Sequence, residues 1–226
     1  YGGVYYHDWY RDEEETGGLF LQKATHDLDY INYLLGIKPV WISAMKAKQV
    51  FKGTKPPGLK CIDCEEKESC LDSPFHPDYS ESETDSVKPS DSMCAFAVDT
   101  GNEDSASALI EYETGMHVAY SQNFFARKGA AKRGARLLGY KGTLEFDWYT
   151  DELKVFMHHT PQVESYKVGA AIGHGGGDKV LAWNFLDVIE GKAETLAPLS
   201  AGLLSVLMCL KAKESALTKS FQLIKF

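Results

Sequence analysis

The sequence predicts an α+β fold, in which an open, predominantly antiparallel sheet of about six strands carries helices on one face. Three observations lead to this prediction: a helical pattern comes first, short strand patterns joined by turns follow it, and only helical patterns come after them. Strands that follow one another through short turns pair antiparallel, whereas alternating strands and helices would build a parallel sheet. No linker separates two hydrophobic segments, so residues 1–226 are expected to form a single domain.

The first helix is expected over residues 17–36, between two glycine positions. Its apolar residues have the three- and four-residue spacing of a buried stripe: Leu21, Ala24, Leu28, Ile31, Leu34 and Leu35. Gln22, His26 and Asp29 follow the same spacing, so they are expected to share one side of the helix. Such a concentration of polar groups beside a buried stripe is typical of an active-site helix.

Lys23 precedes His26 by three residues and belongs to the same polar region. A lysine that is desolvated in a closed cleft has a lowered pKa, which suits proton transfer at a substrate oxygen. Two alternatives stay open. In one, His26 is an ordinary buried histidine, and in the other, Lys23 forms an exposed ion pair with Asp27.

The remaining elements follow from alternating patterns and turn signals. Strands are expected over 40–50, 106–112, 116–125, 136–140, 143–146, 153–158 and 163–168. Glu113-Thr114-Gly115 and Lys141-Gly142 supply the tight turns of two hairpins. Helices are expected over 178–190 and from 200 to about 220, before a short apolar tail at 222–224.

Residues 52–93 are different, because they combine prolines, many acids and few aliphatic side chains, and they are expected to form a long loop outside the domain. Four cysteines accompany this loop: Cys61, Cys64, Cys70 and Cys94. A Cys-x2-Cys pair brings two thiolates within reach of one metal, and two further thiolates would complete a tetrahedral structural zinc site. A disulfide, free thiols, and His76 as a substitute ligand are the alternatives.

Composition argues against several classes of protein. The net charge of −8 disfavours non-specific binding to nucleic acid. No apolar run approaches the ~20 residues that a membrane-spanning helix needs. No strand pattern is followed by a Gly-x-Gly-x-x-Gly helix start, so a dinucleotide-binding fold is not expected within this sequence.

The N-terminal segment is rich in aromatic residues. Tyr6, Trp9 and Arg11 combine flat apolar faces with polar edges, which suits the rings and hydroxyl groups of a sugar. The alternative is an aromatic strand that packs against the body of the domain.

Four motifs occur in order along the sequence. They are Gly17-Gly18 with His26 and Asp29, Leu-Leu-Gly-Tyr-Lys-Gly-Thr-Leu at 137–144, His174-Gly-Gly-Gly-Asp178, and a last helix that begins Pro198-Leu-Ser-Ala-Gly202. In this order they resemble the C-terminal, substrate-binding domain of the Gfo/Idh/MocA oxidoreductases. The resemblance covers nearly all of the chain outside 52–93.

This resemblance implies a fold like the C-terminal domain of glyceraldehyde-3-phosphate dehydrogenase. It also implies a cytoplasmic NAD(P)-dependent oxidoreductase that acts on a sugar, a polyol or a derivative and forms homo-oligomers through its open sheet face. The NAD or NADP would be bound mainly by an N-terminal Rossmann domain that this sequence does not include, so the chain alone is expected to be inactive. Two alternatives are a glycosidase of the same family that retains its NAD, and a non-catalytic binding or assembly module.

The resemblance also implies roles for particular residues. His26 matches the family's proton relay, and Asp29 matches the acid that follows it. Gln22 stands where the family has a carboxylate, and an amide cannot exchange a proton. Lys23 is therefore expected to orient or polarise the substrate oxygen, while Gln22, Asp29 and His174 contact the substrate.

Overall fold

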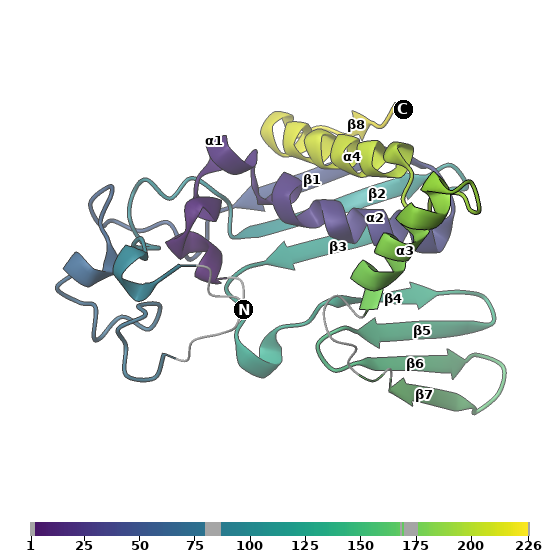
Figure 1. Ribbon diagram of the computed structural model, residues 1–226, viewed down its shortest axis with the longest axis horizontal. Coiled ribbons are helices and arrows are strands. Elements are labelled where there is room, and N and C mark those ends of the chain that lie inside the picture. The colour runs from purple at the N-terminus through teal and green to yellow at the C-terminus, as the bar shows by residue number, and fades with distance from the viewer. Residues whose placement is uncertain (1–2, 80–86, 168, 170–175, 226) are drawn as a thin grey trace. The chain divides into compact units, whose positions relative to one another are not determined.

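The computed structural model describes residues 3–79, 87–167, 169 and 176–225 (Figure 1). The chain divides into two compact units. Unit 1 comprises Tyr1–Ala126 and Leu199–Phe226, and unit 2 comprises Arg127–Pro198. The α+β class and the antiparallel pairing expected from the sequence are confirmed. A single domain over 1–226 stays a prediction.

Unit 1 begins with short helices and continues into a four-stranded antiparallel sheet. Its helices are η1 (Gly3–His7), η2 (Trp9–Arg11), α1 (Glu13–Thr16), η3 (Phe20–Ala24), α2 (Thr25–Leu35), η4 (Cys61–Asp63), η5 (Pro89–Asp91) and α4 (Leu199–Thr218). Its strands are β1 (Pro39–Ala47), β2 (Ser105–Tyr112), β3 (His117–Asn123) and β8 (Gln222–Leu223), in the spatial order β3-β2-β1-β8. Helices α2 and α4 pack against each other and α4 packs on β1, so these helices cover one face of the sheet (Figure 1).

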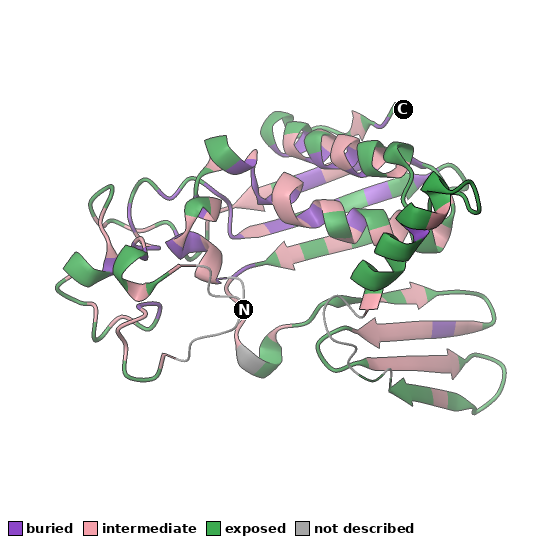
Figure 2. Cartoon of the chain, viewed as in Figure 1, coloured by how far each residue is buried: buried purple, intermediate pink, exposed green. Residues whose placement is uncertain are grey.

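The covered face is apolar because side chains alternate between the two faces along a strand. In β2 every second residue from Ala106 to Tyr112 is buried, and Ser107, Leu109 and Glu111 between them are exposed. The main core combines these β2 positions with Ile42, Ala44, Phe20, Ala24, Leu28, Met208, Cys209, Ala212 and Ile224 (Figure 2). Of the apolar stripe expected on the first helix, Ala24 and Leu28 are buried, and Leu21, Ile31 and Leu35 are half-buried. Leu34 is 53% exposed, so it does not belong to the buried stripe.

A second, smaller core holds the N-terminal segment in place. It consists of Tyr6, Leu19, Phe51, Ala95 and Phe124. Tyr6 stacks on Phe51 with their ring centroids 4.2 Å apart. The Tyr6 hydroxyl donates a hydrogen bond to the carbonyl oxygen of Glu103 at 2.6 Å, which satisfies the one polar group of this buried ring.

Helix α4, with 20 residues, is the longest helix in the described parts of the chain. Its Ser215 hydroxyl accepts the backbone N–H of Ala44 at 2.9 Å and donates to the carbonyl of Ser220 at 2.6 Å, so this side chain ties α4 to β1. Across the described ranges, no helix has both the length and the apolar character that crossing a bilayer requires.

Unit 2 contains the second sheet. Its elements are η6 (Lys128–Ala130), β4 (Gly134–Leu138), β5 (Gly142–Asp147), β6 (Glu152–Met157), β7 (Val163–Lys167) and α3 (Gly177–Ile189). Each strand pairs with the next along the chain, in the order β4-β5-β6-β7, so the sheet is an antiparallel meander. The hairpin expected around 136–146 is present, and α3 corresponds to the helix expected over 178–190.

The described residues thus contain eight strands in two sheets of four, where the sequence predicts one sheet of about six. Seven of these strands overlap the seven ranges expected from the sequence, and the additional strand is β8, which pairs with Trp41 and Ile42 of β1. Two residues are too few to show an alternating pattern, so sequence analysis did not identify this strand. The division into two sheets depends on which strand edges pair, and the pattern of a single strand does not determine that choice.

Residues 52–79 and 87–93 contain the short helices η4 and η5 and little other regular structure. Two isolated bridges connect this stretch to neighbouring chain, from Lys55 to Ala97 and from Lys60 to Met93. Cohesion here comes from backbone hydrogen bonds and turns rather than from a hydrophobic cluster of its own.

Candidate functional site

The candidate site is organised by a break between α1 and α2. Helix α1 ends at Thr16, and Gly17 and Gly18 then adopt φ angles of 72° and 104°, a region that L side chains rarely adopt. A one-turn π-helix, η3, follows before α2 begins at Thr25. The helix predicted over 17–36 therefore starts later and changes its hydrogen-bond pattern partway along. Single π-turns of this kind occur frequently at functional sites.

A buried carboxylate anchors the start of η3. Glu103 accepts the backbone N–H of Phe20 at 2.9 Å through Oε1 and the Lys46 ammonium at 3.4 Å through Oε2. Lys46 also donates to Glu13 at 2.9 Å, and Lys213 pairs with the same Glu13 oxygen at 3.0 Å. Although partial burial opposes the shift, the two carboxylates hold the pKa of Lys46 above its ordinary value. This network fixes the backbone as it enters η3.

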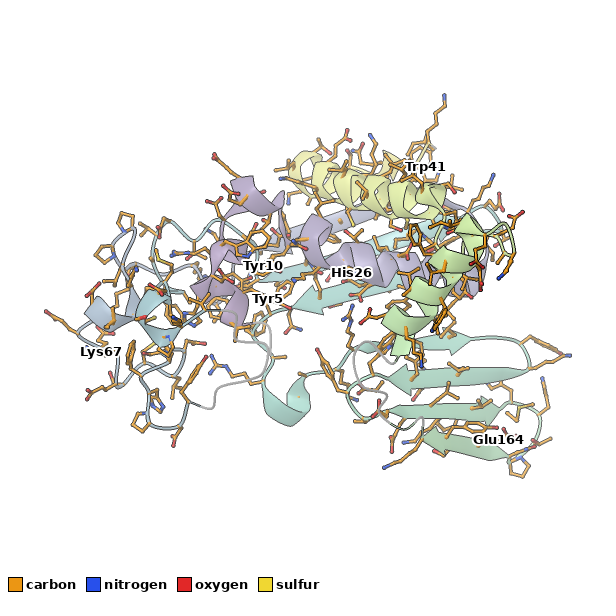
Figure 3. All side chains as sticks on the ribbon, viewed as in Figure 1. Tyr5, Tyr10, His26, Trp41, Lys67 and Glu164 are labelled. Carbon is orange, nitrogen blue, oxygen red and sulfur yellow. The ribbon has the colours of Figure 1, made fainter. Side chains whose placement is uncertain are left out.

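The η3 turn places Lys23 against two tyrosines of the N-terminal segment. The Lys23 Nζ lies 4.2 Å from the ring centroid of Tyr5 and 4.1 Å from that of Tyr10. The two rings are 5.1 Å apart, and Figure 3 shows them close to the helix that carries His26. Aromatic faces attract a cation through their quadrupole, so the two rings favour this position of the Lys23 ammonium group.

Trp9 extends this aromatic group. Its ring stacks on Tyr10 with centroids 4.1 Å apart, and 47% of the Trp9 side chain is exposed. Trp9 also lines an open cavity of about 460 Å³, together with His7, Asp8, Val87, Lys88, Asp91 and Met93. An exposed aromatic face beside charged hydrogen-bonding groups is the combination that a sugar ring and its hydroxyl groups require.

His26 lies in the first turn of α2, and its side chain is exposed. Asp29, three residues later on the same helix, accepts a hydrogen bond from the Ser205 hydroxyl at 3.0 Å. Gln22 is half-buried in η3. Because a π-turn has more residues per turn than an α-helix, Gln22 and His26 do not keep the angular register assumed for one continuous α-helix. His26 and Asp29 do keep the angular register of an α-helix, because both residues belong to α2.

Asp27, on the same helix, contacts the sheet. Its Oδ2 accepts a hydrogen bond from the Tyr120 hydroxyl at 2.9 Å, and that hydroxyl also lies 3.0 Å from Oε1 of Gln122. Burial, followed by the nearby charge of Asp27, raises the pKa of Tyr120 well above its ordinary range. Tyr120 is therefore a neutral hydrogen-bond donor that fixes Asp27 against β3.

Two residues expected to line a sugar face the interior of unit 1. Tyr6 is fully buried in the second core, and Arg11 is 6% exposed. The Arg11 Nη2 donates to Asp99 at 2.7 Å and to Thr100 at 2.8 Å. Of the three residues predicted in this segment, Trp9 is the one with a large exposed face. The predicted His174 lies outside the described residues.

The four cysteines predicted as zinc ligands are all free thiols. Cys61 and Cys94 are buried, and Cys64 and Cys70 are half-buried. Among the residues that the structure describes, no three or more His, Cys, Asp or Glu side chains are arranged as a metal-binding group. The zinc site thus stays a prediction.

Sequence analysis did not select three tyrosines as site residues: Tyr5 and Tyr10, which contact Lys23, and Tyr120, which contacts Asp27. Tyr5 and Tyr10 belong to the aromatic segment, but nothing in their local pattern shows that they, rather than Tyr6, point toward Lys23. Tyr120 is 93 residues away from Asp27 in the sequence, and only the pairing of β3 within the sheet brings it close.

Comparison with known proteins assigns the chain to a protein family. The family model described as "Oxidoreductase family, C-terminal alpha/beta domain" (GFO_IDH_MocA_C) matches residues 2–223. A protein of Bacillus subtilis (strain 168) that is named "Putative oxidoreductase YteT" is 27% identical over 214 residues. That alignment covers 80% of this chain and 49% of YteT.

Solved structures show the same fold at low sequence identity. An oxidoreductase domain protein from Kribbella flavida has a TM-score of 0.69 at 14% identity, covering 97% of this chain and 53% of its own. Levoglucosan dehydrogenase, in complex with NADH and levoglucosan, has a TM-score of 0.68 at 15% identity, covering 97% and 54%. Aldose-aldose oxidoreductase from Caulobacter crescentus, complexed with glycerol, has a TM-score of 0.62 at 12% identity, covering 96% and 51%. The chain thus spans about half the length of these relatives.

Proposed function

Since this chain belongs to the Gfo/Idh/MocA oxidoreductase family as its C-terminal alpha/beta domain, we propose that it is the substrate-side half of an NAD(P)-dependent enzyme that oxidises or reduces a sugar, a polyol or a derivative. The cofactor would be bound mainly by a further domain of the longer protein, because the chain covers only about half of its relatives. In the levoglucosan dehydrogenase structure, the bound molecules are NADH and levoglucosan.

The observation that carries this proposal is the position of Lys23 between Tyr5 and Tyr10. The two rings attract the ammonium group and restrict its position. A fixed positive charge stabilises negative charge that develops on an oxygen during hydride transfer. Lys23 therefore acts as the group that orients and polarises the reacting oxygen.

His26 is the proton-transfer group in this proposal. Its imidazole is exposed on α2, so it can exchange protons with solvent or with a substrate hydroxyl. Asp29 lies within one turn of it and is oriented by Ser205, which suits a role in binding substrate hydroxyl groups. Gln22 is an amide, so it contributes hydrogen bonds but no proton.

Trp9 supplies the surface on which the sugar ring stacks. Tyr10 covers one face of the Trp9 ring, and nearly half of the Trp9 side chain is exposed. The neighbouring cavity presents Asp8, Lys88 and Asp91, whose charged groups can bind hydroxyls. Tyr6 and Arg11 support this surface from the interior instead of contacting the sugar.

The test uses the longer protein that contains this chain and measures nicotinamide absorbance with a panel of sugars and polyols. Lys23→Met should lower kcat by about 100-fold, as expected when one charge-stabilising group is removed. Lys38→Met, which changes an exposed lysine before β1, is the matched control and should leave kcat unchanged. The chain of 226 residues alone should show no turnover.

Three other results would each overturn part of the proposal. Hydrolysis of a glycoside without net change in the cofactor would indicate a glycosidase that retains its NAD. Bound cofactor with no turnover on any substrate would indicate a binding or assembly module. Full activity of Lys23→Met would show that Lys23 is not a catalytic residue, even if the enzyme acted on a sugar.

Self-association is a further part of the proposal. The face of the unit 1 sheet opposite α2 and α4 presents Trp41, Met45 and Leu109, which are 38%, 72% and 54% exposed. Apolar side chains on an open sheet face favour contact with a second copy of the chain.

A further inference from the structure

Tyr10 separates the Lys23 side of the candidate site from the Trp9 side. The Lys23 Nζ lies 4.1 Å from the centroid of the Tyr10 ring, and the stacked Trp9 ring also lies 4.1 Å from it, with 28° between the two ring planes. A stacked ring fills the space above the face that it covers, so an ammonium group at the same distance cannot share that face. Lys23 and Trp9 therefore occupy opposite faces of Tyr10.

Trp9 lines a cavity on the other side of the N-terminal segment. Nearly half of the Trp9 side chain is exposed, and the open cavity of about 460 Å³ is also lined by Asp91 and Met93. His7 holds the N-terminal segment against this stretch, because its Nδ1 donates to the Met93 carbonyl at 2.7 Å. Figure 1 shows the N-terminal helices, in purple, between α2 and the long loops that follow β1. The cavity and the Lys23 ammonium thus lie on opposite sides of this segment.

The distance across the aromatic stack decides what can occupy both sides. A sugar ring on the free face of Trp9 would lie about 3.5–4 Å beyond the indole plane, which is the separation of atoms in contact. Two centroid distances of 4.1 Å already separate that indole from the Lys23 Nζ. The centre of the stacked sugar would thus be on the order of 12 Å from Nζ, whereas the hydroxyl oxygens of one pyranose lie only one or two bonds outside its ring. A single ring cannot stack on Trp9 and also place its reacting oxygen at Lys23.

We propose that the substrate has at least two linked sugar rings, of which one reacts at Lys23 and His26 while another stacks on Trp9 in the cavity. This inference rests on the proposed function, because Lys23 marks the position of the reacting oxygen. Lys23, Tyr5 and Tyr10 are each half-buried, so part of each side chain is open to solvent and linked sugar rings can follow them toward Trp9. The substrate is therefore an oligosaccharide rather than a free monosaccharide.

The cavity has the groups that a second sugar ring needs. Its volume falls within the roughly 300–1,000 Å³ of sites that enclose small molecules. Asp8 and Asp91 offer carboxylate oxygens, which accept hydrogen bonds from hydroxyl groups, and Lys88 offers an ammonium group, which donates them. Asp91 also pairs with Lys60 at 3.2 Å, and this pair restricts the orientation of its carboxylate.

Kinetics of the longer protein, saturated with its nicotinamide cofactor, test the two-ring substrate. Glucose and galactose are compared with cellobiose, maltose, lactose and melibiose, which are built from those two sugars. We expect kcat/KM to be about 10-fold higher for at least one disaccharide than for the monosaccharide that it contains, because the second ring adds a stacking contact and hydrogen bonds. Trp9→Ala should reduce this ratio about 10-fold through KM, and Trp9→Phe, which keeps an aromatic face, should retain most of it.

Two further variants separate the second sugar position from general effects on the fold. Asp91→Ala removes a carboxylate from the cavity without changing the aromatic stack, and it should weaken disaccharide binding about 5-fold. Tyr33→Ala removes an aromatic ring of α2 that is 78% exposed and lies outside the cavity lining, so it should leave the ratio unchanged. Circular dichroism shows whether each variant folds.

Titration calorimetry separates this inference from the proposed function, because it measures binding to the longer protein whether or not a sugar is turned over. Tighter binding of a disaccharide than of its monosaccharide, reduced in Trp9→Ala, would support the second sugar position even if no nicotinamide were reduced. The inference is overturned if every disaccharide binds no more tightly than the monosaccharide that it contains, or if Trp9→Ala and Asp91→Ala bind all of these sugars as the unchanged protein does. Turnover of glucose or galactose without preference for a disaccharide would leave the proposed function standing and overturn only this inference.

Discussion

Replacing Glu103 tests whether a buried carboxylate holds the η3 turn in place. Glu103 is 3% exposed, accepts the N–H of Phe20 and pairs with Lys46. Glu103→Ala would leave the Phe20 N–H without an acceptor and Lys46 with Glu13 alone. Glu103→Gln keeps an acceptor for Phe20 and removes only the charge.

The expected loss in the free energy of unfolding follows from these contacts. A buried N–H that loses its acceptor costs about 1–3 kcal/mol, and loss of the 3.4 Å contact with Lys46 adds roughly 1.5 kcal/mol, the lower end for charged hydrogen bonds. Glu103→Ala should therefore lower the free energy of unfolding by about 3 kcal/mol, which corresponds to a fall in Tm of about 6–12 °C for a chain of this size. Glu103→Gln should cost about 1 kcal/mol.

Urea denaturation followed by circular dichroism measures both variants. Glu214→Gln is the control, because it removes an exposed pair with Lys211 and should change stability by no more than about 0.5 kcal/mol. Hydrogen exchange at the Phe20 amide should accelerate strongly in Glu103→Ala and only slightly in Glu103→Gln. If Glu103→Ala were as stable as the control and protected Phe20 equally well, the anchor assigned to Glu103 would be wrong.

Three further predictions concern unit 1. Partial burial alone would raise the pKa of Glu13, but hydrogen bonds from Lys46 and Lys213 hold that pKa below the ordinary value of 4.5. The stabilisation from Glu13 should therefore be complete above pH 4.5 and disappear as the pH falls below it, and Glu13→Gln should remove this part of the pH dependence of urea denaturation. Leu28→Ala should cost about 2–5 kcal/mol because Leu28 is fully buried in the main core, and a smaller loss in thermal unfolding would contradict the packing described here. Met45→Lys should shift the chain toward monomer in light scattering if the open sheet face mediates self-association, and an unchanged mass would exclude that face.

Much of the fold follows from local patterns in the sequence. The alternation in β2, the glycine after α2 at Gly36 and the spacing of Leu28 with its apolar neighbours each act within a few residues, so they determine strands and helix ends without reference to the rest of the chain. The four ordered motifs point to the oxidoreductase family, and the family model over residues 2–223 confirms it.

The tertiary structure decided which side chains meet. The π-turn before Thr25 changes the relation between Gln22 and His26, and it begins where the Phe20 N–H donates a hydrogen bond to Glu103, 83 residues away. The spacing of residues within the helix could not predict that contact, because Glu103 lies far away in the sequence.

The aromatic N-terminal segment shows the same limit of prediction from sequence. Its composition predicts a sugar-binding surface, yet the sequence could not tell that Tyr6 stacks inside the second core while Tyr5 and Tyr10 hold Lys23. Which tyrosine is buried depends on packing against residues far along the chain, such as Phe51 and Phe124. Local sequence determines which elements form, and long-range packing determines which face of each element becomes the site, because burial free energy is gained only when distant segments meet.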